Sequence, residues 1–226
     1  MTNRVATYRT GTMARDASLL STHRVLRNTY ALLGLTLLFS AAVAGISTAL
    51  ALPAPGLILT LVGFYGLFFL TSRLANSAWG LASTFALTGF MGYTLGPLLN
   101  RTLALPGGEM IVAMALGGTA TIFLGLSAVV LVTKRDFSFM GGFLFVGMLV
   151  AMLAGLGAVF FQVPALALAV SAAVVLLMAG MILFETSNIL HGGETNYIMA
   201  TVSLYVSIYN LFTSLLALLG FASRDE

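Results

Sequence analysis

The chain has 226 residues, of which 59% are hydrophobic and only 8% are charged, and its mean hydropathy is +1.04. Its 10 basic and 7 acidic side chains are too few to cover a soluble domain, in which roughly 25% of residues are charged. A soluble enzyme is therefore excluded. Because the chain has no cysteine, disulfides, thiolate metal sites and cysteine nucleophiles are excluded as well.

Seven apolar segments follow one another along the chain. A helix needs about 20 mostly apolar residues to cross the hydrocarbon core of a bilayer, and each segment reaches or approaches that length. Connectors rich in Pro, Gly or charge separate them. We therefore predict an all-α membrane protein with seven transmembrane helices. The segments are 30–52, 57–72, 78–96, 110–132, 139–161, 165–186 and 197–220.

The basic residues indicate the orientation, since cytoplasmic loops retain Lys and Arg. With the N-terminus inside, eight basic side chains lie on the cytoplasmic side, and only Arg101 and Arg224 lie outside. We predict a mobile cytoplasmic head over 1–29, a transmembrane domain over 30–220 and a short extracytoplasmic tail over 221–226. Six or eight spans would reverse the tail. The first segment is longer than a signal peptide's apolar region, so we expect it to be retained.

Small residues recur at helical spacing in three of these segments. Helices associate inside a bilayer where small residues let their backbones approach closely. We therefore predict that such residues form packing ridges and hold a tight bundle together. The longest ridge lies in the third segment, with Gly80, Thr84, Thr88, Gly92 and Gly96 at every fourth position. Shorter ridges are Gly117, Thr121 and Gly125 in the fourth segment, and Gly147, Ala151 and Gly155 in the fifth.

One carboxylate lies convincingly within the apolar segments. An ionisable group inside a membrane costs a few kcal/mol or more, so Glu185 is the first candidate for function. Asn188 shares its helix face at i+3. The last segment carries Ser203, Ser207, Asn210 and Ser214 along one face, and we expect this seam to face the interior and meet Glu185. Two alternatives stay open: interhelical hydrogen bonding by the seam, and snorkelling of Glu185 to the cytoplasmic interface.

Signatures of catalysis and of cofactor binding are missing from the sequence. His23 and His191 are far apart and lie outside any His-Glu-x-x-His pattern, and no glycine-rich phosphate loop is followed by Lys. An intramembrane hydrolase would need a carboxylate pair or a nucleophile–base dyad within its spans. We therefore predict that the protein is not an enzyme and that it binds no cofactor and no metal.

Several motifs together resemble the Bax inhibitor-1 family over nearly the whole chain. The most specific is the run Phe-Glu-Thr-Ser-Asn-Ile-Leu-His-Gly-Gly-Glu-Thr-Asn-Tyr-Ile at 184–198, followed by Leu-Tyr-Val-Ser-Ile-Tyr-Asn-Leu-Phe at 204–212. The run Gly-Tyr-Thr-Leu-Gly-Pro at 92–97 and the Lys-Arg-Asp-Phe-Ser-Phe connector at 134–139 also match. The resemblance implies a bundle in which six helices surround the last one.

The resemblance also implies two functions. It is closest to bacterial inner-membrane members that associate with the membrane protease FtsH and its HflK-HflC partners, as a substrate and as a brake on membrane-protein degradation. Other members are pH-sensitive calcium leak channels that use two aspartates and an arginine on the second helix. Glu185 occupies the first aspartate position, Ser207 the second, and Arg73 lies near the arginine's place.

The candidate pH-sensing site implied by these positions consists of Glu185, Asn188, Ser207, Asn210 and Arg73. Serine in place of the second aspartate removes the coupling of two carboxylates that share a proton. It also halves the anionic ligands for a divalent cation. A cation leak of calcium or protons through Glu185 and the seam is therefore the alternative, and modulation of FtsH is the leading hypothesis.

Overall fold

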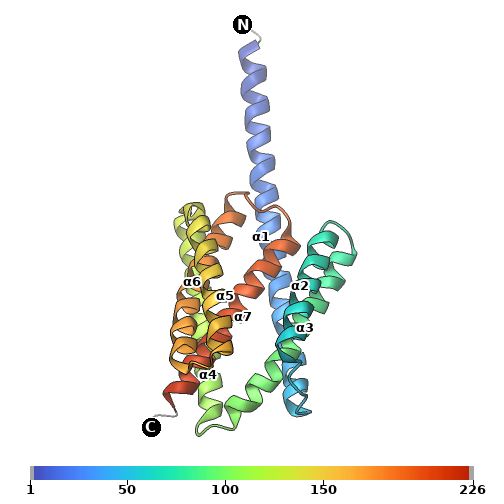
Figure 1. Ribbon diagram of the computed structural model, residues 1–226. Helices are drawn as coiled ribbons and strands as arrows, with labels where there is room; N and C mark the ends of the chain where they lie inside the picture. Colours follow the sequence, from blue (N-terminus) through green and yellow to red (C-terminus); the bar gives the residue numbers. More distant parts are fainter. Residues whose placement is uncertain (1–2, 224–226) are drawn as a thin grey trace.

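A computed structural model describes the backbone of residues 3–223 and the side chains of residues 23–223. Over residues 3–223 the chain forms seven α-helices and one short 3-10 helix, with no strand, which confirms the predicted all-helical class (Figure 1). The helices are α1 (Asn3–Ala49), α2 (Gly56–Leu74), α3 (Trp79–Leu103), α4 (Gly108–Thr133), α5 (Gly141–Phe160), α6 (Pro164–Leu190) and α7 (Tyr197–Ala222), and the 3-10 helix η1 spans Ser138–Met140.

Six of these helices contain a stretch that is long and apolar enough to cross a membrane. They are all but α3, whose glycines, serines and threonines lower its hydropathy although it has 25 residues. In Figure 1, α3 nevertheless runs between the two ends of the bundle, as its neighbours do. A multipass membrane protein is thus supported, whereas the seventh span stays a prediction.

The N-terminal head and the tail were assigned to 1–29 and 221–226. The side chains of residues 1–22 and all of residues 224–226 lie outside the described part of the chain, so the mobility of the head and the side occupied by the tail stay predictions.

Local signals explain where the last two helices begin. Proline is tolerated at the first position of a helix because its missing N–H has no partner there, and α6 begins at Pro164. Before α7, the side-chain oxygen of Asn196 accepts hydrogen bonds from the backbone N–H groups of Ile198 and Met199, at 2.9 and 3.2 Å. These signals place the start of α7 at the predicted boundary.

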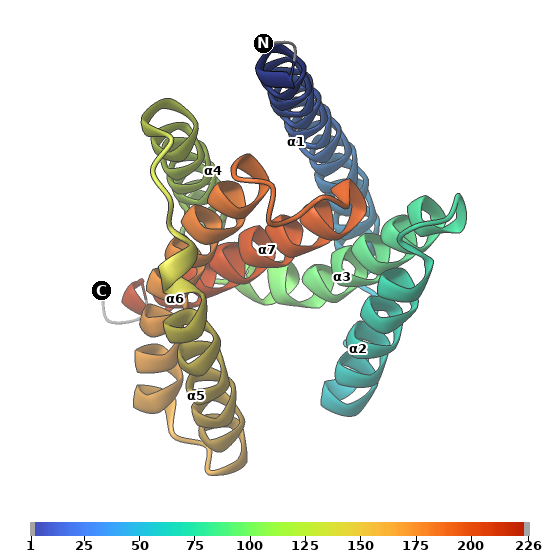
Figure 2. The ribbon, with the colours of Figure 1, turned by 90° about the horizontal axis from the view of Figure 1, so that it is seen from above.

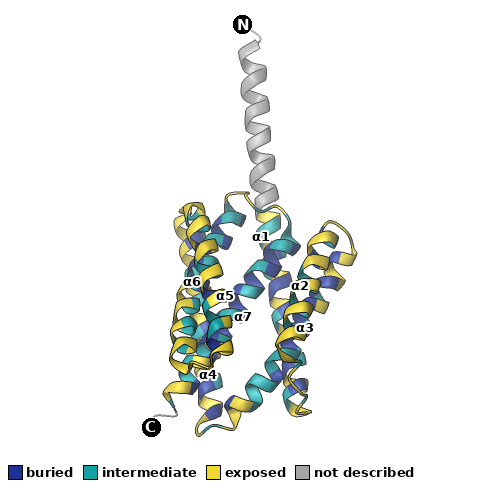
Figure 3. Ribbon diagram, viewed as in Figure 1, coloured by how far each residue is buried: buried dark blue, intermediate teal, exposed yellow. Residues whose placement is uncertain are grey.

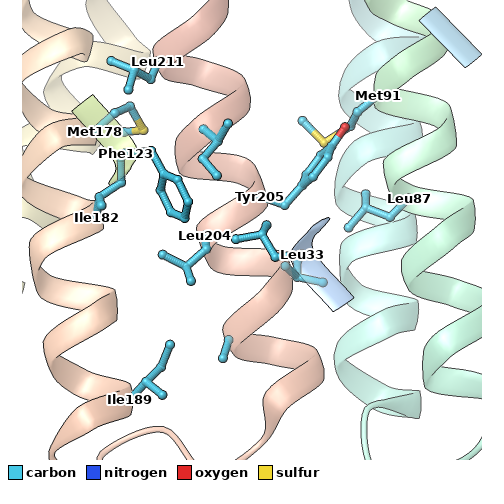
Figure 4. Packing of buried hydrophobic residues seen from close by; sticks show 13 residues of the cluster. Leu33, Leu87, Met91, Phe123, Met178, Ile182, Ile189, Leu204, Tyr205 and Leu211 are labelled. Atoms are coloured by element: carbon cyan, nitrogen blue, oxygen red, sulfur yellow. The ribbon is translucent and has the colours of Figure 1, made fainter. Parts of the chain in front are cut away.

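Helix α7 is the most buried of the helices that pass the length and hydropathy criteria, and it packs against α1, α3, α4 and α6. Its Leu204, Tyr205 and Leu211 join the main apolar core with Leu33 of α1 and Leu87 of α3 (Figure 4). Helix α2 packs on α3, and α5 packs on α6. Viewed from above, α2 and α5 stand apart on one side of α7 (Figure 2). A ring of six helices around α7 stays a prediction.

The ridge of the third segment lies on a buried face of α3. A Cβ atom added at Gly92 or Gly96 would collide with Ser40 or Ser47 of α1, respectively, so the two helices approach closely at these glycines. Thr84 and Thr88 are fully buried. Gly80 serves another contact, since a Cβ there would lie 2.7 Å from the carbonyl oxygen of Leu74 in the preceding turn and 2.8 Å from Ile198.

Of the two shorter ridges, the one in α5 lies against a neighbouring helix and the one in α4 does not. In α5, a Cβ at Gly147 would lie 2.6 Å from the Leu177 side chain of α6, and one at Gly155 would contact Val170 at 3.7 Å. In α4, the prediction was wrong, because the ridge is exposed and Gly117 and Gly125 have open space around them. Helix α7 differs, since Figure 3 colours most of it as buried or intermediate.

The buried face of α4 has the same four-residue spacing as its exposed ridge. Spacing alone therefore cannot say which stripe of a helix faces a neighbour. Which stripe is buried depends on the bulk of its side chains and on the neighbouring helix. On the buried stripe, Ile111 and Ala115 pack with Phe212 and Leu216 of α7. The buried residues of α4 are Gly108, Ile111, Ala115, Thr119, Phe123, Ser127 and Val130.

Candidate functional site

The centre of the candidate site is a hydrogen bond between α6 and α7. The Ser207 hydroxyl donates to Oε2 of Glu185 at 3.0 Å, and the two side chains are 2% and 8% exposed. Ser207 is the only side chain that bonds to the carboxyl within the described residues. The carboxyl therefore points towards α7 and into the bundle, whereas a snorkelling side chain would extend out of it.

Two other residues of the candidate site bond elsewhere. Asn188 shapes the connection after α6, since its backbone oxygen accepts hydrogen bonds from the N–H groups of Gly193 and Glu194 at 2.9 and 3.2 Å. Asn210 donates within its own helix, from Nδ2 to the backbone oxygen of Val206 at 2.8 Å. Neither residue hydrogen-bonds to Glu185.

Arg73 also lies away from the carboxyl. Its side chain is exposed at the end of α2, and its guanidinium sits over the Phe69 ring, 4.9 Å from the centroid. The structure thus brings together two of the five residues, Glu185 and Ser207. A cation path that also needs an arginine and a second anionic group is not assembled in this conformation.

Two tyrosines of α7 make contacts that the sequence analysis missed. The Tyr205 hydroxyl is 2.5 Å from Ser40 Oγ and donates to the Thr88 carbonyl at 3.2 Å, which links α7 to α1 and α3. The Tyr209 hydroxyl is 2.8 Å from Thr94 Oγ1 of α3. Two phenols four residues apart share a helix face, and a buried hydroxyl needs a partner. The spacing could therefore have predicted that both hydroxyls are hydrogen-bonded, although it does not identify their partners.

A second polar cluster fixes the α4–α5 connector to the end of α6. Ser187 Oγ accepts the backbone N–H of Phe137 at 2.9 Å. His191 follows α6 directly. Its Nδ1 is 2.9 Å from the Ser187 carbonyl oxygen, and its Nε2 is 3.2 Å from that of Lys134. In the connector, the Ser138 N–H donates to Asp136 at 2.8 Å and holds the pKa of that carboxyl below its usual value.

The chemistry available to the central pair is limited. A carboxyl and a hydroxyl can share a hydrogen bond and exchange a proton with a neighbour, but divalent cations require several oxygen ligands. Within the described residues, no three His, Asp or Glu side chains gather where they could hold a metal ion. The geometry therefore favours a role in holding α6 against α7.

Comparisons with known proteins cover almost the whole chain. The family described as "Inhibitor of apoptosis-promoting Bax1" matches residues 22–224. The chain is 62% identical over 208 residues to the "Modulator of FtsH protease YccA" of Escherichia coli, covering 92% of this chain and 94% of that one. Its counterpart in a second Escherichia coli strain is called "Inner membrane protein YccA".

The similarity extends to other bacteria. An uncharacterised protein of Pseudomonas aeruginosa is 59% identical over 202 residues, covering 89% of this chain and 91% of its own. A protein of Neisseria meningitidis is 35% identical over 215 residues, covering 90% of this chain and 93% of its own. Since the family match runs from residue 22 to residue 224 and relatives of high identity cover the chain almost completely, the chain belongs to the Bax inhibitor-1 family.

Proposed function

We propose that this chain binds FtsH and its HflK-HflC partners in the inner membrane, both as a substrate and as a negative modulator of membrane-protein degradation. The observation that carries the proposal is the 62% identity, over 92% of the chain, to a protein named a modulator of FtsH protease. The matched stretch of 208 residues is too long to leave out either the helices or their connectors, which supports a shared role as well as a shared fold.

The packing of the bundle supplies a physical basis for inhibition. A processive protease engages one end of a substrate and pulls, and a bundle that resists unfolding holds the protease for longer. The close approach of α1 and α3 at Gly92 and Gly96 provides that resistance in the helix that follows the N-terminal end. We assign the handle to the N-terminal segment, residues 1–29, on the cytoplasmic side.

Two experiments on the full chain test this proposal. Affinity purification from detergent-solubilised membranes should recover FtsH together with HflK-HflC, and recovery of neither would contradict it. Deleting residues 1–15 should slow FtsH-dependent turnover of the protein, whereas removing residues 224–226 should not. Unchanged decay after the N-terminal deletion would show that the protease engages another part of the chain.

The proposed arrangement has seven spans, the N-terminus in the cytoplasm and the C-terminus outside. Because the natural chain has no cysteine, single cysteines can be introduced and labelled with a membrane-impermeant reagent in intact and in opened cells. The exposed residues Ser77 and Ala104 flank α3. Ser77→Cys should be protected in intact cells, and Ala104→Cys should be labelled. The reverse pattern would overturn the orientation, and equal protection of both positions would overturn the passage of α3 across the membrane.

The buried Glu185–Ser207 pair also allows a test of the cation path. We expect calcium flux into liposomes to stay at background for the natural protein and for Glu185→Gln, since only one carboxyl is present at the pair. A flux well above protein-free liposomes that falls in Glu185→Gln would establish the leak instead.

A further inference from the structure

The bundle has a lateral groove between α2 and α5, and its base reaches α7. Its walls are Phe64 and Phe68 of α2 and Met148 and Met152 of α5, with α6 behind them, and its volume is about 770 Å³. All four helices contain candidate membrane spans. The groove therefore lies at the depth of the hydrocarbon core and opens sideways.

Protein side chains do not close this groove. Helices α2 and α5 share no extensive packing interface, and the one hydrogen bond found between them in the described residues joins the Tyr65 hydroxyl to the Met152 sulfur at 3.5 Å. Of all residues in α2, Thr71 alone is buried. The side of α2 that faces α5 thus has no partner within the described chain.

Water does not suit this groove. A buried water molecule needs two to four polar partners, and the polar side chains in the lining are those of Tyr65 and Asn210. Tyr65 donates its hydroxyl hydrogen to Met152, and Asn210 donates one of its two amide hydrogens to the backbone of Val206. Two side chains cannot supply the partners that water filling a groove of about 770 Å³ would need. The remaining lining is apolar, and an unfilled void of this size would forfeit dispersion contacts on every wall.

A helix of another protein suits this lining poorly. Helix contacts in membranes favour small residues that let the backbones approach closely. The walls of the groove carry instead the bulky side chains of Phe64, Phe68, Met148 and Met152.

We propose that an acyl chain of a membrane phospholipid occupies this groove and supplies the packing between α2 and α5 that the protein lacks. A hydrocarbon chain is narrow and flexible, and the methionine side chains of the lining are flexible and polarisable enough to adapt to it. The chain lies against Val206 and Asn210, the first of which precedes Ser207 directly in sequence. The lipid thereby covers the side of α7 next to the Glu185–Ser207 pair.

Photolabelling of the full-length protein tests the proposal. The protein is reconstituted in vesicles of phosphatidylethanolamine and phosphatidylglycerol with a phosphatidylcholine that carries a diazirine midway along one acyl chain. Labelling at Met148 and Met152 should exceed, by severalfold, labelling at Val132 and Leu176, which are 80% and 76% exposed. If the labelling yield instead rises with the exposed fraction of each side chain, the probe reports ordinary boundary lipid, and the proposal is overturned.

A matched pair of variants on α5 separates the groove from the outer surface. Leu149 lines the groove, whereas Val150, the next residue, does not. Leu149→Trp should lower groove labelling at least fivefold, and Val150→Trp should leave it unchanged. Equal labelling in both variants, or cross-linking of the groove to a second copy or to another protein, would overturn the proposal.

A measurement on the unmodified chain keeps the proposal falsifiable if Leu149→Trp does not fold. Native mass spectrometry of the protein purified in detergent should find one phospholipid retained per chain. Its complete absence at the mildest detergent conditions would contradict a built acyl-chain site.

Discussion

Two pairs of helices in this bundle are arranged in opposite ways. Helices α1 and α3 approach closely, whereas a groove separates α2 from α5. At the first, Gly92 and Gly96 leave no room for a Cβ atom, and Ser47 donates across the contact to the Tyr93 carbonyl at 3.0 Å. At the second, one phenol–thioether hydrogen bond crosses a groove of about 770 Å³.

Hydropathy does not decide which helices of this bundle pack against each other. Helix α3, which fails the hydropathy criterion for a span, makes the closest backbone contact, whereas α2 and α5 meet the criterion and remain apart. Lipid solvates leucine and phenylalanine about as well as another helix does, so the gain from helix contact comes mainly from close approach at small residues and from polar pairs. Apart from the Tyr65–Met152 hydrogen bond, the bulky residues of α2 and α5 that line the groove offer neither of these gains to each other.

We expect the largest effect on stability from a side chain added at the α1–α3 contact. Gly96→Leu should lower the free energy of unfolding in micelles by about 3 kcal/mol or more, because the new side chain collides with the side chain and backbone of Ser47. The matched control is Gly117→Leu on the exposed ridge of α4, which has open space around it and should change stability by less than about 0.5 kcal/mol. Equal losses would mean that close glycine packing does not stabilise this bundle.

A smaller effect is expected at the polar contact between α6 and α7. Ser207→Ala leaves the buried Glu185 carboxyl without its donor and should cost about 1 to 2 kcal/mol in unfolding experiments in micelles. Ser203→Ala on the same helix is the control, since Ser203 makes no side-chain hydrogen bond within the described residues, and it should be nearly neutral. If Ser207→Ala left the free energy of unfolding unchanged, the Glu185–Ser207 pair would not stabilise the bundle.

Much of this architecture could be predicted from the sequence. Seven apolar segments correspond to the seven helices, and the spacing of small residues predicted a packing face for α3. The prediction that the seam of α7 meets Glu185 agrees with the Ser207 hydrogen bond. These features depend on short-range periodicity and on the cost of burying polar groups, both of which a sequence displays directly.

The remaining features depend on which helices become neighbours, and periodicity does not contain that information. Two stripes of α4 share the same spacing, and only the position of α7 decides that Ala115 is buried and Gly117 exposed. Tyr205 reaches Ser40 across 165 positions of sequence. Likewise, the groove exists because α2 packs on α3 and α5 on α6, which no single helix reveals.

The hydroxyl groups of Tyr205 and Tyr65 should contribute unequally to stability. Tyr205→Phe removes contacts to both α1 and α3 and should cost about 1 kcal/mol, in the range of a buried interhelical hydrogen bond. Tyr65→Phe removes the bond to the weak thioether acceptor of Met152 and should cost under about 0.3 kcal/mol. Unfolding in micelles measures both. A larger loss for Tyr65→Phe would show that this bond, and not a bound hydrocarbon chain, holds α2 near α5.

The smallest expected effect concerns the connector that leads into α5. The pKa of Asp136 is lowered mainly by the Ser138 N–H, so its ionised form stabilises the folded connector above the usual carboxyl pKa. This stabilisation is lost as the pH falls through the lowered pKa. Melting curves from about pH 6 to about pH 3 should therefore show a small destabilisation of Asp136→Asn at the upper end that shrinks towards the lower end. The effect is small because the carboxyl is exposed and solvent screens its charge. If the difference in melting temperature between the two proteins does not depend on pH, the ionised form has no such role.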